Sequence, residues 1–247
     1  GECDIALVSC EGILTASSSI ACAVAGMTSA DGKCHSFDES AMGYGRGEGC
    51  GALVLKLVEE YSNTDSMYAV VCGSAVAQDG KSASLTAPNG LAQEQLLRTA
   101  LQDAGLQPSD VSFIEAHGTG TKLGDPVETE ALSRVFGENR GAPLYVCGVK
   151  ANIGHLEASA GMAGLFAAIV TLQYRQLPPN AQLRTLNKEV EMSVSGTKIA
   201  FPTASQALPM SADLVAGVSS FGYSGTIAHV LLAEATIPKR KRGKASA

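Results

Sequence analysis

EAHGTGTKLGDPVETEAL, at residues 115–132, is the stretch that most constrains the fold and function of this chain. It begins at the end of VSFIEA, an apolar segment that predicts a strand. It continues into DPVETEAL, where proline and acids in a first turn predict a helix. His117 lies in the glycine-rich loop between them, the place where α/β folds position functional residues. Asp125 and Glu128 are able to fix its imidazole. The alternative is a histidine that only forms hydrogen bonds within its loop.

VKANIGHLEASAGMAG, at residues 149–164, carries the second histidine of interest, His155. We expect His155 to begin a helix, whose dipole lowers the pKa of the imidazole and keeps it neutral. A capping role at the same helix is the alternative. Lys150 lies between a predicted strand and this helix. A buried lysine needs a carboxylate partner, and Glu128 and Asp125 are the candidates.

Two imidazoles that come together beside hydrogen-bond donors suit chemistry that builds negative charge on a carbonyl oxygen. SFGYSGT at 220–226 predicts a strand, a turn and a second strand, and the N–H groups of this turn are candidates for an oxyanion hole. An ordinary hairpin is the alternative. No cysteine has the helix N-terminus or the cationic neighbour that activates a thiolate. The sequence therefore offers no convincing nucleophile.

Strand and helix patterns alternate along the chain, which predicts an α/β fold with parallel strands and helical crossovers. Residues 67–77 form an apolar run without alternation, so we expect both faces of that strand to be covered. A buried strand is expected within 43–60, a helix over the sheet within 12–30, and a polar loop at 27–40. The remaining expected strands and helices lie at 90–105 (helix), 111–116 (strand), 125–136 (helix), 143–149 (strand), 155–172 (helix), 215–219 (strand) and 226–232 (strand).

Composition and charge narrow the class of protein. The 247 residues are 45% hydrophobic and only 17% charged, which allows a large core, and the formal net charge is −6. KRKRGK at 239–244 contributes five of the 18 basic residues and no acid, so the rest of the chain carries a formal charge of −11. An acidic body argues against nucleic acid as the main ligand. We interpret this tail as a solvated linker end. No signal peptide or bilayer-spanning run is visible, and a cytoplasmic protein that does not bind a membrane is expected, with an organelle as an alternative.

The cysteines and glycines do not suggest a cofactor. Seven cysteines occur without a CxxC pair, which is typical of reduced, buried thiols. The two histidines, Asp125 and Glu128 lack the helical spacing of a metal site, so no metal is predicted. GYGRGEGCG at 43–51 lacks the GK[ST] of a phosphate-binding loop.

The chain contains several long motifs: GECDIALV, FDESAMGYGRGEGCGALVLK, QDGKSASLTAPNG, EAHGTGTKLGDPVETEAL, VKANIGHLEASAGMAGL, QLPPN and GVSSFGYSGTIAHVLL. In family order from residue 1 to about residue 234, they resemble the β-ketoacyl synthase (ketosynthase) family, and within it the modular polyketide synthases. The resemblance implies a thiolase-like layered αβαβα fold, here the end of the first half and the complete second half. It assigns residues 1–80 to the N-terminal half, 81–237 to the C-terminal half, and 238–247 to a basic tail or linker.

The resemblance also implies a reaction, the decarboxylative Claisen condensation of polyketide or fatty acid synthesis. In this acyltransferase family a cysteine takes an acyl chain from an acyl carrier protein, and a malonyl-type extender on a second carrier is decarboxylated to an enolate that attacks the thioester. His117 and His155 match the two histidines that assist decarboxylation and stabilise the oxyanion. Lys150 matches the lysine that organises them, with Glu128 and Asp125 in the same polar network.

Further roles follow from the same resemblance. Tyr223 stands where the family often has a Phe that gates the pocket and lends its backbone N–H to the oxyanion hole, and Phe221 lies in the same turn. Thr119 and Thr121 match residues that contact the phosphopantetheine arm of the carrier protein. That arm comes with the substrate, and the chain itself is expected to bind no cofactor. A homodimer is implied.

Departures from the family pattern leave alternatives open. The family places its nucleophilic cysteine shortly before the GECD segment, so we expect that cysteine and the N-terminal half to come from outside Gly1–Ala247, as preceding chain or as a companion chain. The 247 residues alone are then expected to be inactive. Ile227 replaces an Asn that is usual, and Met42 and Ala77 replace a common Asp and Asn. One alternative is a non-catalytic ketosynthase-like partner subunit that binds carrier protein or sets chain length; another is a thiolase-fold acyltransferase that uses coenzyme A directly.

Overall fold

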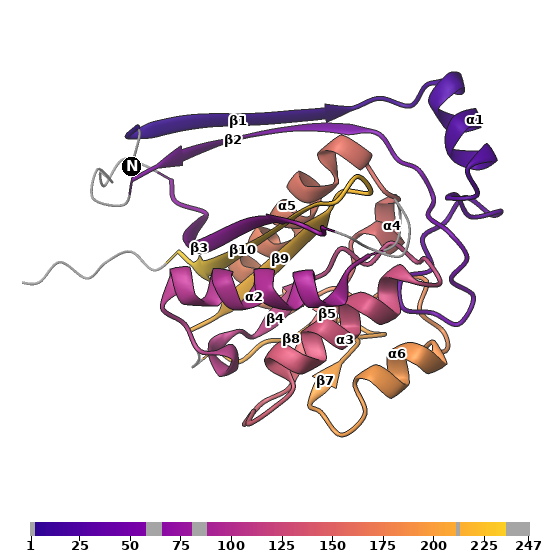
Figure 1. The fold of residues 1–247 in the computed structure, drawn as a ribbon. Helices are drawn as coiled ribbons and strands as arrows, with labels where there is room; N and C mark the ends of the chain where they lie inside the picture. The colour runs from indigo at the N-terminus through magenta and orange to yellow at the C-terminus, as the bar shows by residue number, and fades with distance from the viewer. Residues whose placement is uncertain (1–2, 58–65, 81–87, 211–212, 236–247) are drawn as a thin grey trace, which may run out of the picture.

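A six-stranded mixed sheet forms the centre of the molecule (Figure 1). The computed structural model describes residues 3–57, 66–80, 88–210 and 213–235; the basic tail and the boundary expected at residue 80/81 therefore fall wholly or partly outside the described residues. The strand order is β3-β10-β9-β4-β5-β7, with bounds β3 Ala69–Gln78, β4 Phe113–Glu115, β5 Leu144–Cys147, β7 Ile199–Ala200, β9 Val215–Phe221 and β10 Thr226–Glu234.

The expectation of parallel strands is right for one half of the sheet and wrong for the other. Strands β9, β4, β5 and β7 are parallel, whereas β10 is antiparallel to both β9 and β3. The reason lies in the connection from β9 to β10, a tight turn in which the Gly222 N–H bonds to Thr226 O at 2.7 Å. Such a short turn joins only antiparallel strands.

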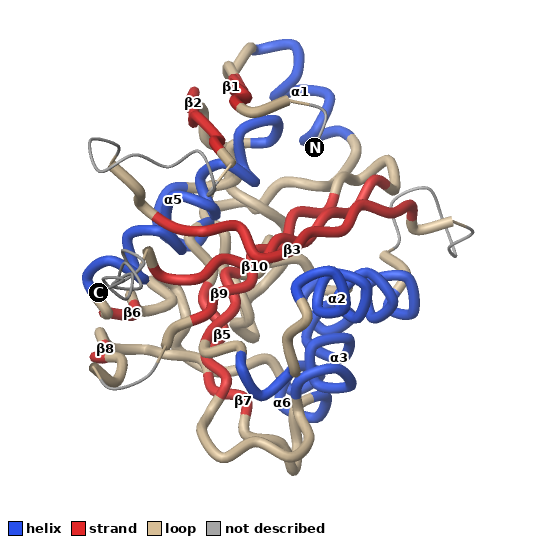
Figure 2. Tube along the Cα trace, turned by 90° about the vertical axis from the view of Figure 1, so that its left-hand side faces the viewer, coloured by secondary structure: helices blue, strands red, loops and turns tan. Residues whose placement is uncertain are grey.

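Helices cover both faces of this sheet, and a two-stranded antiparallel sheet lies beyond one of them (Figure 2). Helices α2 (Gly90–Ala104) and α3 (Gly124–Phe136) pack on one face, and α5 (Ala160–Tyr174) packs on the other. Strands β1 (Ile5–Gly12) and β2 (Gly49–Lys56) pair with each other over the outer side of α5. The described layers thus alternate β, α, β and α.

Glycines allow these layers to approach closely. A Cβ atom on Gly73 of β3 would lie 2.5 Å from the backbone N of Ala104 in α2. On the other face, a Cβ on Gly164 of α5 would lie 3.3 Å from Val218 Cγ1 in β9. Helix α2 begins where the Asn89 side chain accepts the N–H groups of Leu91 and Ala92, and it ends at a left-handed glycine.

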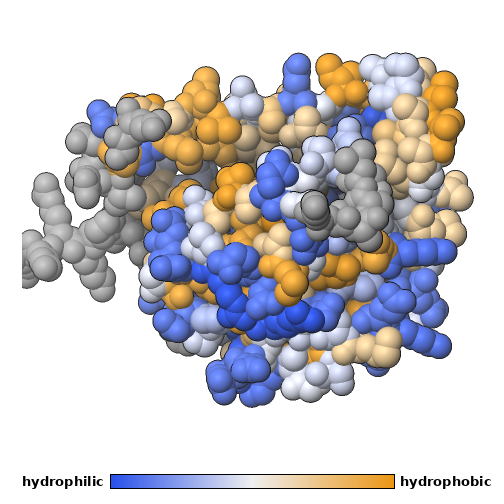
Figure 3. Space-filling model, viewed as in Figure 1, coloured by the Kyte–Doolittle hydropathy of each residue, from blue (hydrophilic) through white to orange (hydrophobic). Residues whose placement is uncertain are grey.

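Four expectations about the first 80 residues differ from the structure. The helix expected over the sheet is α1 (Ala16–Val24), which has no buried residue and covers no strand. Strand β2 is largely exposed because, within the described ranges, it pairs with β1 alone, and apolar surface along this two-stranded sheet is visible in Figure 3. Strand β3 is the edge of the sheet, so its faces alternate in exposure instead of both being covered. The segment 27–40, expected as a polar loop, buries Cys34 and Phe37 beneath the loop that follows β4.

Short elements complete the fold, and none is a membrane span. They are α4 (Lys150–Ile153), α6 (Lys188–Ser193), the 3-10 helices Pro108–Asp110 and Glu157–Ser159, and the pair β6 (Gln176–Leu177) with β8 (Gln206–Ala207). Within the described ranges, no helix combines the length and the apolar character needed to cross a bilayer.

Candidate active site

The two histidines of interest meet at the end of the parallel strands. His117 follows β4 and His155 follows α4, yet their rings lie 5.5 Å apart between centroids and at 84°, edge to face. Tyr44 packs against the His155 ring at 4.9 Å, and Phe221 packs against the His117 ring at 5.4 Å. The structure therefore brings the pair together within an aromatic enclosure.

The environment of His117 defines its tautomer. The Phe221 backbone N–H donates to Nδ1 of His117 at 3.2 Å. A backbone N–H can only donate, so Nδ1 is the acceptor and the ring proton lies on Nε2. Burial, then Lys150, then His155 hold the pKa of His117 well below its usual value. His117 is thus a neutral imidazole whose Nε2–H is available as a donor.

Two carboxylates hold the loop that carries His117. Glu128 of α3 accepts the backbone N–H of His117 at 2.7 Å and that of Gly118 at 2.8 Å. Asp125 accepts the N–H of Gly120 at 3.1 Å and that of Phe37 at 2.7 Å. Burial raises the pKa of Asp125 to about 7 and raises that of Glu128 as well. Both side chains therefore hold the backbone of this loop in place. This is a more specific role than the membership of a polar network that the sequence predicts for them.

His155 is not at the start of a helix, and the expected dipole effect is wrong. Helix α4 ends at Ile153 and α5 begins at Ala160, so His155 lies in the bend between them. The bend forms because Gly154 adopts a φ of +79°, which interrupts the helix. Burial, with a further contribution from Lys150, lowers the pKa of His155 to about 3. Its Nδ1 accepts the Glu157 backbone N–H at 2.9 Å, so Nε2 carries the proton here too.

Lys150 is buried beside the histidines, but its expected carboxylate partners are not in direct contact. Among the described residues, no ion pair or hydrogen bond joins Lys150 to Asp125 or Glu128. Burial lowers the pKa of Lys150, and Glu115 opposes that shift more strongly than Glu128 does. Both expected partners are instead occupied by backbone N–H groups.

Glu115 also belongs to this site, although no sequence motif singles it out. It ends β4, accepts the Val149 N–H at 2.7 Å, and has its pKa raised to about 7 by burial. The signal available in the sequence is a single acid in the otherwise apolar segment VSFIEA. A buried acid next to a buried lysine is a candidate pair.

The other predicted residues lie around the pair. Thr119 and Thr121 share a hydrogen bond between hydroxyls at 3.1 Å, and Thr121 Oγ1 also accepts the N–H of Gly124. Phe221 supplies the backbone donor and the ring contact described above. Tyr223 lies in the turn between β9 and β10 with 71% of its surface exposed, so its gating role stays a prediction.

The described thiols do not supply a nucleophile beside the histidines. Cys34 and Cys147 are buried, and burial raises the pKa of Cys34 to about 11 and raises that of Cys147 further. Such thiols stay protonated and unreactive. Cys3 and Cys50 are exposed, which departs from the expectation of buried thiols, because both lie in or beside the two-stranded sheet of β1 and β2, which is largely exposed. No group of residues able to hold a metal ion occurs in the described part of the chain.

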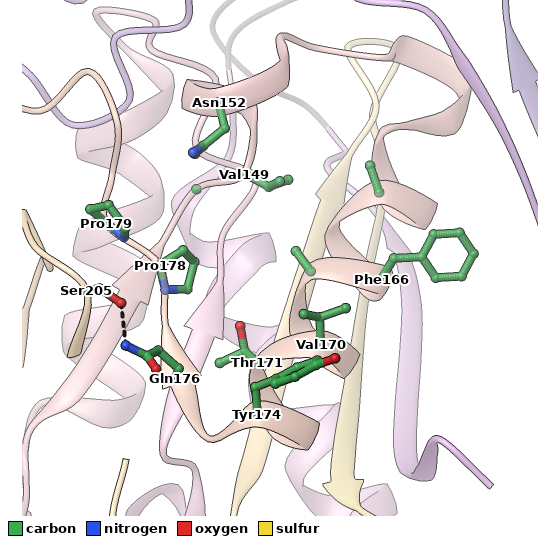
Figure 4. Close-up of a pocket in the computed structure, with 13 residues that line it drawn as sticks. Val149, Asn152, Phe166, Val170, Thr171, Tyr174, Gln176, Pro178, Pro179 and Ser205 are labelled. Atoms are coloured by element: carbon green, nitrogen blue, oxygen red, sulfur yellow. Dashed lines mark hydrogen bonds between the residues drawn. The ribbon is translucent and has the colours of Figure 1, made fainter. Parts of the chain in front are cut away.

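An open groove of about 630 Å³ runs from the residues that flank Lys150 along α5 (Figure 4). Val149 lies at one end, and Phe166 and Tyr174 of α5 line it opposite Pro178 and Pro179. Its lining includes no charged residue. The groove therefore adds apolar surface beside a site that is otherwise polar.

The chain matches two parts of one known family. Residues 1–61 match the family described as the β-ketoacyl synthase N-terminal domain, and residues 68–184 match the β-ketoacyl synthase C-terminal domain. The 6-methylsalicylic acid synthase of Penicillium expansum is 49% identical over 216 residues, which is 85% of this chain and 12% of the relative. A component of the phenolphthiocerol/phthiocerol polyketide synthase of Mycobacterium bovis is 45% identical over 215 residues, 84% of this chain and 11% of the relative.

Solved structures of ketosynthase domains have the same fold as this chain. The ketosynthase from module 6 of the bacillaene synthase of Bacillus subtilis 168 superposes with a TM-score of 0.90 at 38% identity, covering 95% of this chain and 43% of that one. The oxazolomycin ketosynthase domain of Streptomyces albus JA3453 has a TM-score of 0.90 at 33% identity, and the match covers 96% of this chain and 42% of that domain. The chain thus spans about an eighth of the curated relatives and less than half of these solved domains.

Proposed function

This chain belongs to the β-ketoacyl synthase family, and we propose that it supplies the histidine pair and the lysine of a ketosynthase site. The proposed reaction is the decarboxylative Claisen condensation of an acyl thioester with a malonyl-type extender. The observation that carries the proposal is that His117 and His155 each accept a backbone N–H at Nδ1. Two neutral Nε2–H donors are thereby left free on adjacent rings.

The first step is decarboxylation of the malonyl thioester. The bond between the α-carbon and the carboxylate breaks, CO₂ leaves, and the electron pair passes to the thioester oxygen as an enolate. Preorganised donors stabilise such charge most effectively in a site that excludes water. The Nε2–H groups of His117 and His155 are these donors, and their lowered pKa values keep them neutral at physiological pH.

The second step joins the two substrates. The α-carbon of the enolate attacks the carbonyl carbon of an acyl-cysteine thioester, the carbon–sulfur bond breaks, and the thiolate leaves. The product is a β-ketoacyl thioester on the carrier. We propose that the cysteine comes from outside the described residues, because the buried thiols of Cys34 and Cys147 have raised pKa values.

Lys150 keeps the histidines in their working form. Its positive charge lowers the pKa of both His117 and His155, which opposes protonation of either ring. The same charge favours negative charge that develops on a nearby oxygen. Glu115 and Glu128 favour the charged form of the lysine in turn. The lysine therefore acts by charge and is not required to transfer a proton.

The substrates of this proposal arrive on acyl carrier protein. The hydroxyls of Thr119 and Thr121 lie on the loop after His117, where they are able to bind the polar phosphopantetheine arm. This prosthetic group belongs to the carrier substrate. A homodimer of the complete enzyme is part of the same proposal and stays a prediction.

The test uses the full protein that contains this chain, with malonyl-carrier protein and with malonyl-coenzyme A as alternative substrates. We expect CO₂ release that prefers the carrier-bound substrate, loss of release in His155→Ala, and a severe loss in Lys150→Ala with little change in unfolding. His35→Gln is the control, because that ring bonds to Asp31 outside the pair. Wild-type turnover in either site variant refutes the role assignment. A preference for coenzyme A indicates a different acyltransferase, and no release from wild type supports a non-catalytic partner subunit.

A further inference from the structure

Glu157 adopts a backbone conformation that places its N–H on His155. Its φ is +51°, in the left-handed region that a glutamate occupies only when its surroundings impose it. In this conformation the Glu157 N–H points to Nδ1 of His155 at 2.9 Å. The tautomer of His155 thus depends on a strained residue two positions along the chain.

An arginine whose side chain is largely covered binds the side chain of that residue. Arg46 donates from Nε to Glu157 Oε1 at 2.6 Å and from Nη2 to Oε2 at 2.7 Å, so the pair is bidentate. Only 7% of the Arg46 side chain is exposed. The guanidinium also donates to Ser19 Oγ at 2.6 Å and to Ser18 Oγ at 3.1 Å, in the first turn of α1. Each of the two terminal nitrogens and Nε therefore has an acceptor.

The backbone around Arg46 holds His155 from the other side. The His155 N–H donates to Gly45 O at 2.7 Å, and the Gly47 N–H donates to His155 O at 2.9 Å. Arg46 and His155 are partners in the resulting parallel bridge. The same short segment thus fixes the main chain of His155 and, through Glu157, the ring nitrogen.

We propose that Arg46 is a positioning residue for His155, and that the Arg46–Glu157 ion pair holds the strained Glu157 backbone so that its N–H selects the Nε2–H tautomer. Without the ion pair, Glu157 relaxes toward negative φ and its N–H turns away from Nδ1. The two neutral tautomers of His155 then compete, and part of the population presents a bare Nε2 to the substrate oxygen. The importance of His155 rests on the proposed function, whereas the tautomer effect does not.

The first experiment compares Arg46→Gln with Arg98→Gln in the full protein with ¹⁵N-labelled histidine. Arg98 is the matched control because it forms an exposed ion pair with Glu94 and lies far from the site in α2. We expect the side-chain ¹⁵N signals of His155 to show the Nδ1–H tautomer in Arg46→Gln and not in the control. Decarboxylation should fall about ten- to a hundredfold, by analogy with the loss seen when a group that orients a metal-ligating histidine is removed.

The second experiment separates positioning from general folding. Glycine adopts positive φ without strain, so Glu157→Gly should retain the N–H on His155 without an ion pair. We expect the double variant Arg46→Gln/Glu157→Gly to recover the Nε2–H signal and much of the rate. If Arg46→Gln does not fold, Glu157→Gln replaces it, since this variant keeps Arg46 and the backbone N–H.

Three results overturn the proposal: an unchanged His155 tautomer in Arg46→Gln, an unchanged tautomer in Glu157→Gln, or a double variant no better than Arg46→Gln. The proposed function fails separately, when wild-type protein shows the Nε2–H signal and releases no CO₂. The spectroscopic measurement on wild type therefore distinguishes the failure of one proposal from the failure of the other.

Discussion

The main-chain N–H of Phe221 donates to Nδ1 of His117 at 3.2 Å, and it does so from a strand 104 residues further along the chain. The strand β9 lies next to β4 in the sheet, which brings the two residues together. Because the donor is backbone, no substitution of the Phe221 side chain removes it. His117 is consequently held as a hydrogen-bond donor at Nε2 rather than as a base.

His117→Gln should retain more decarboxylation than His117→Ala. The glutamine amide nitrogen is able to take the place of Nε2 as a donor, whereas alanine leaves none. Loss of one preorganised donor of this kind costs about a hundred- to a thousandfold in kcat, so we expect that loss for alanine and a smaller one for glutamine. Measuring CO₂ release from malonyl-carrier protein checks this. Equal loss in both variants would show that His117 acts as a base.

Glu128→Gln should destabilise the fold through the His117 loop. Both oxygens of Glu128 accept backbone N–H groups. In glutamine an NH₂ group replaces one of these oxygens, so that a donor faces a backbone N–H. A buried donor left without an acceptor costs about 1–3 kcal/mol. Glu130→Gln is the control on the same helix, because its ion pair with Arg134 is exposed and is worth about 0.5 kcal/mol or less. Urea unfolding of both variants measures the difference, and equal free energies would contradict the role of Glu128 in holding the loop.

Gly73→Ala should loosen helix α2 from the sheet. The added Cβ would lie 2.5 Å from the Ala104 backbone N and 2.8 Å from its Cα, and backbone atoms cannot move aside cheaply. Overpacking of this kind costs about 1–3 kcal/mol. Gly141→Ala is the control, since no atom lies within 4 Å of its added Cβ. Thermal unfolding followed by circular dichroism compares the two, and an unaffected Gly73→Ala would show that α2 packs less closely than described.

Local patterns in the sequence predict most single elements and the residues of the candidate site, but not the arrangement of layers. The thiolase-like α/β fold implied by the resemblance is confirmed by the TM-score of 0.90 to ketosynthase domains. The helix at α2 is readable because apolar residues recur with helical spacing up to Gly105, which ends it. The exposure of β2 and the edge position of β3 are not readable, because they depend on which strands pair and not on local composition.

In the candidate site, too, the residues are predictable from the sequence but their arrangement in space is not. The motifs single out His117, His155 and Lys150, and the structure brings the two histidines together. The helix start expected at His155 is wrong because Gly154, with a φ of +79°, bends the chain before α5 begins. Glu115 is not predictable from the sequence, because an acid at the end of an apolar strand resembles an ordinary strand terminus until Lys150 is placed beside it.

Lowering the pH should destabilise the protein through His229. Burial lowers the pKa of His229 to about 3 in the folded state, whereas the unfolded value is about 6.5. Between about pH 3 and pH 6.5 the unfolded chain binds a proton at His229 that the folded chain does not. The free energy of unfolding is therefore highest above about pH 6.5 and decreases as the pH falls through this range. Relative to His229→Gln, the wild type should lose about 2 kcal/mol between pH 7 and pH 5. Urea unfolding at both values checks this, and comparison with the variant cancels the opposite contribution of Glu115 and Asp125, whose pKa values are raised. An unchanged difference in unfolding free energy between wild type and His229→Gln at pH 7 and pH 5 would contradict this prediction.

Ile227→Asn distinguishes a condensing enzyme from a partner subunit. Asn is usual at this position in the family pattern, but here Ile227 is fully buried in β10 and faces Phe221 and Ala77 across the sheet. The substitution removes apolar contacts and buries an amide, at a cost of about 3 kcal/mol, whereas Ile227→Val should cost about 1 kcal/mol. His117 already has its Nδ1 partner from the Phe221 backbone, so we expect an amide side chain at this position to add nothing to the site.

The informative measurement for this variant is the rate of CO₂ release by the folded fraction, taken beside the unfolding free energy. We expect wild type and Ile227→Val to release CO₂ at similar rates and Ile227→Asn to be less stable and no faster. The reason is that the two Nε2–H donors are set by backbone groups, which the side chain at 227 does not supply. A silent wild type that gains decarboxylation in Ile227→Asn would instead identify the natural chain as a non-catalytic partner, in which the loss of a side-chain amide disabled an otherwise complete donor pair.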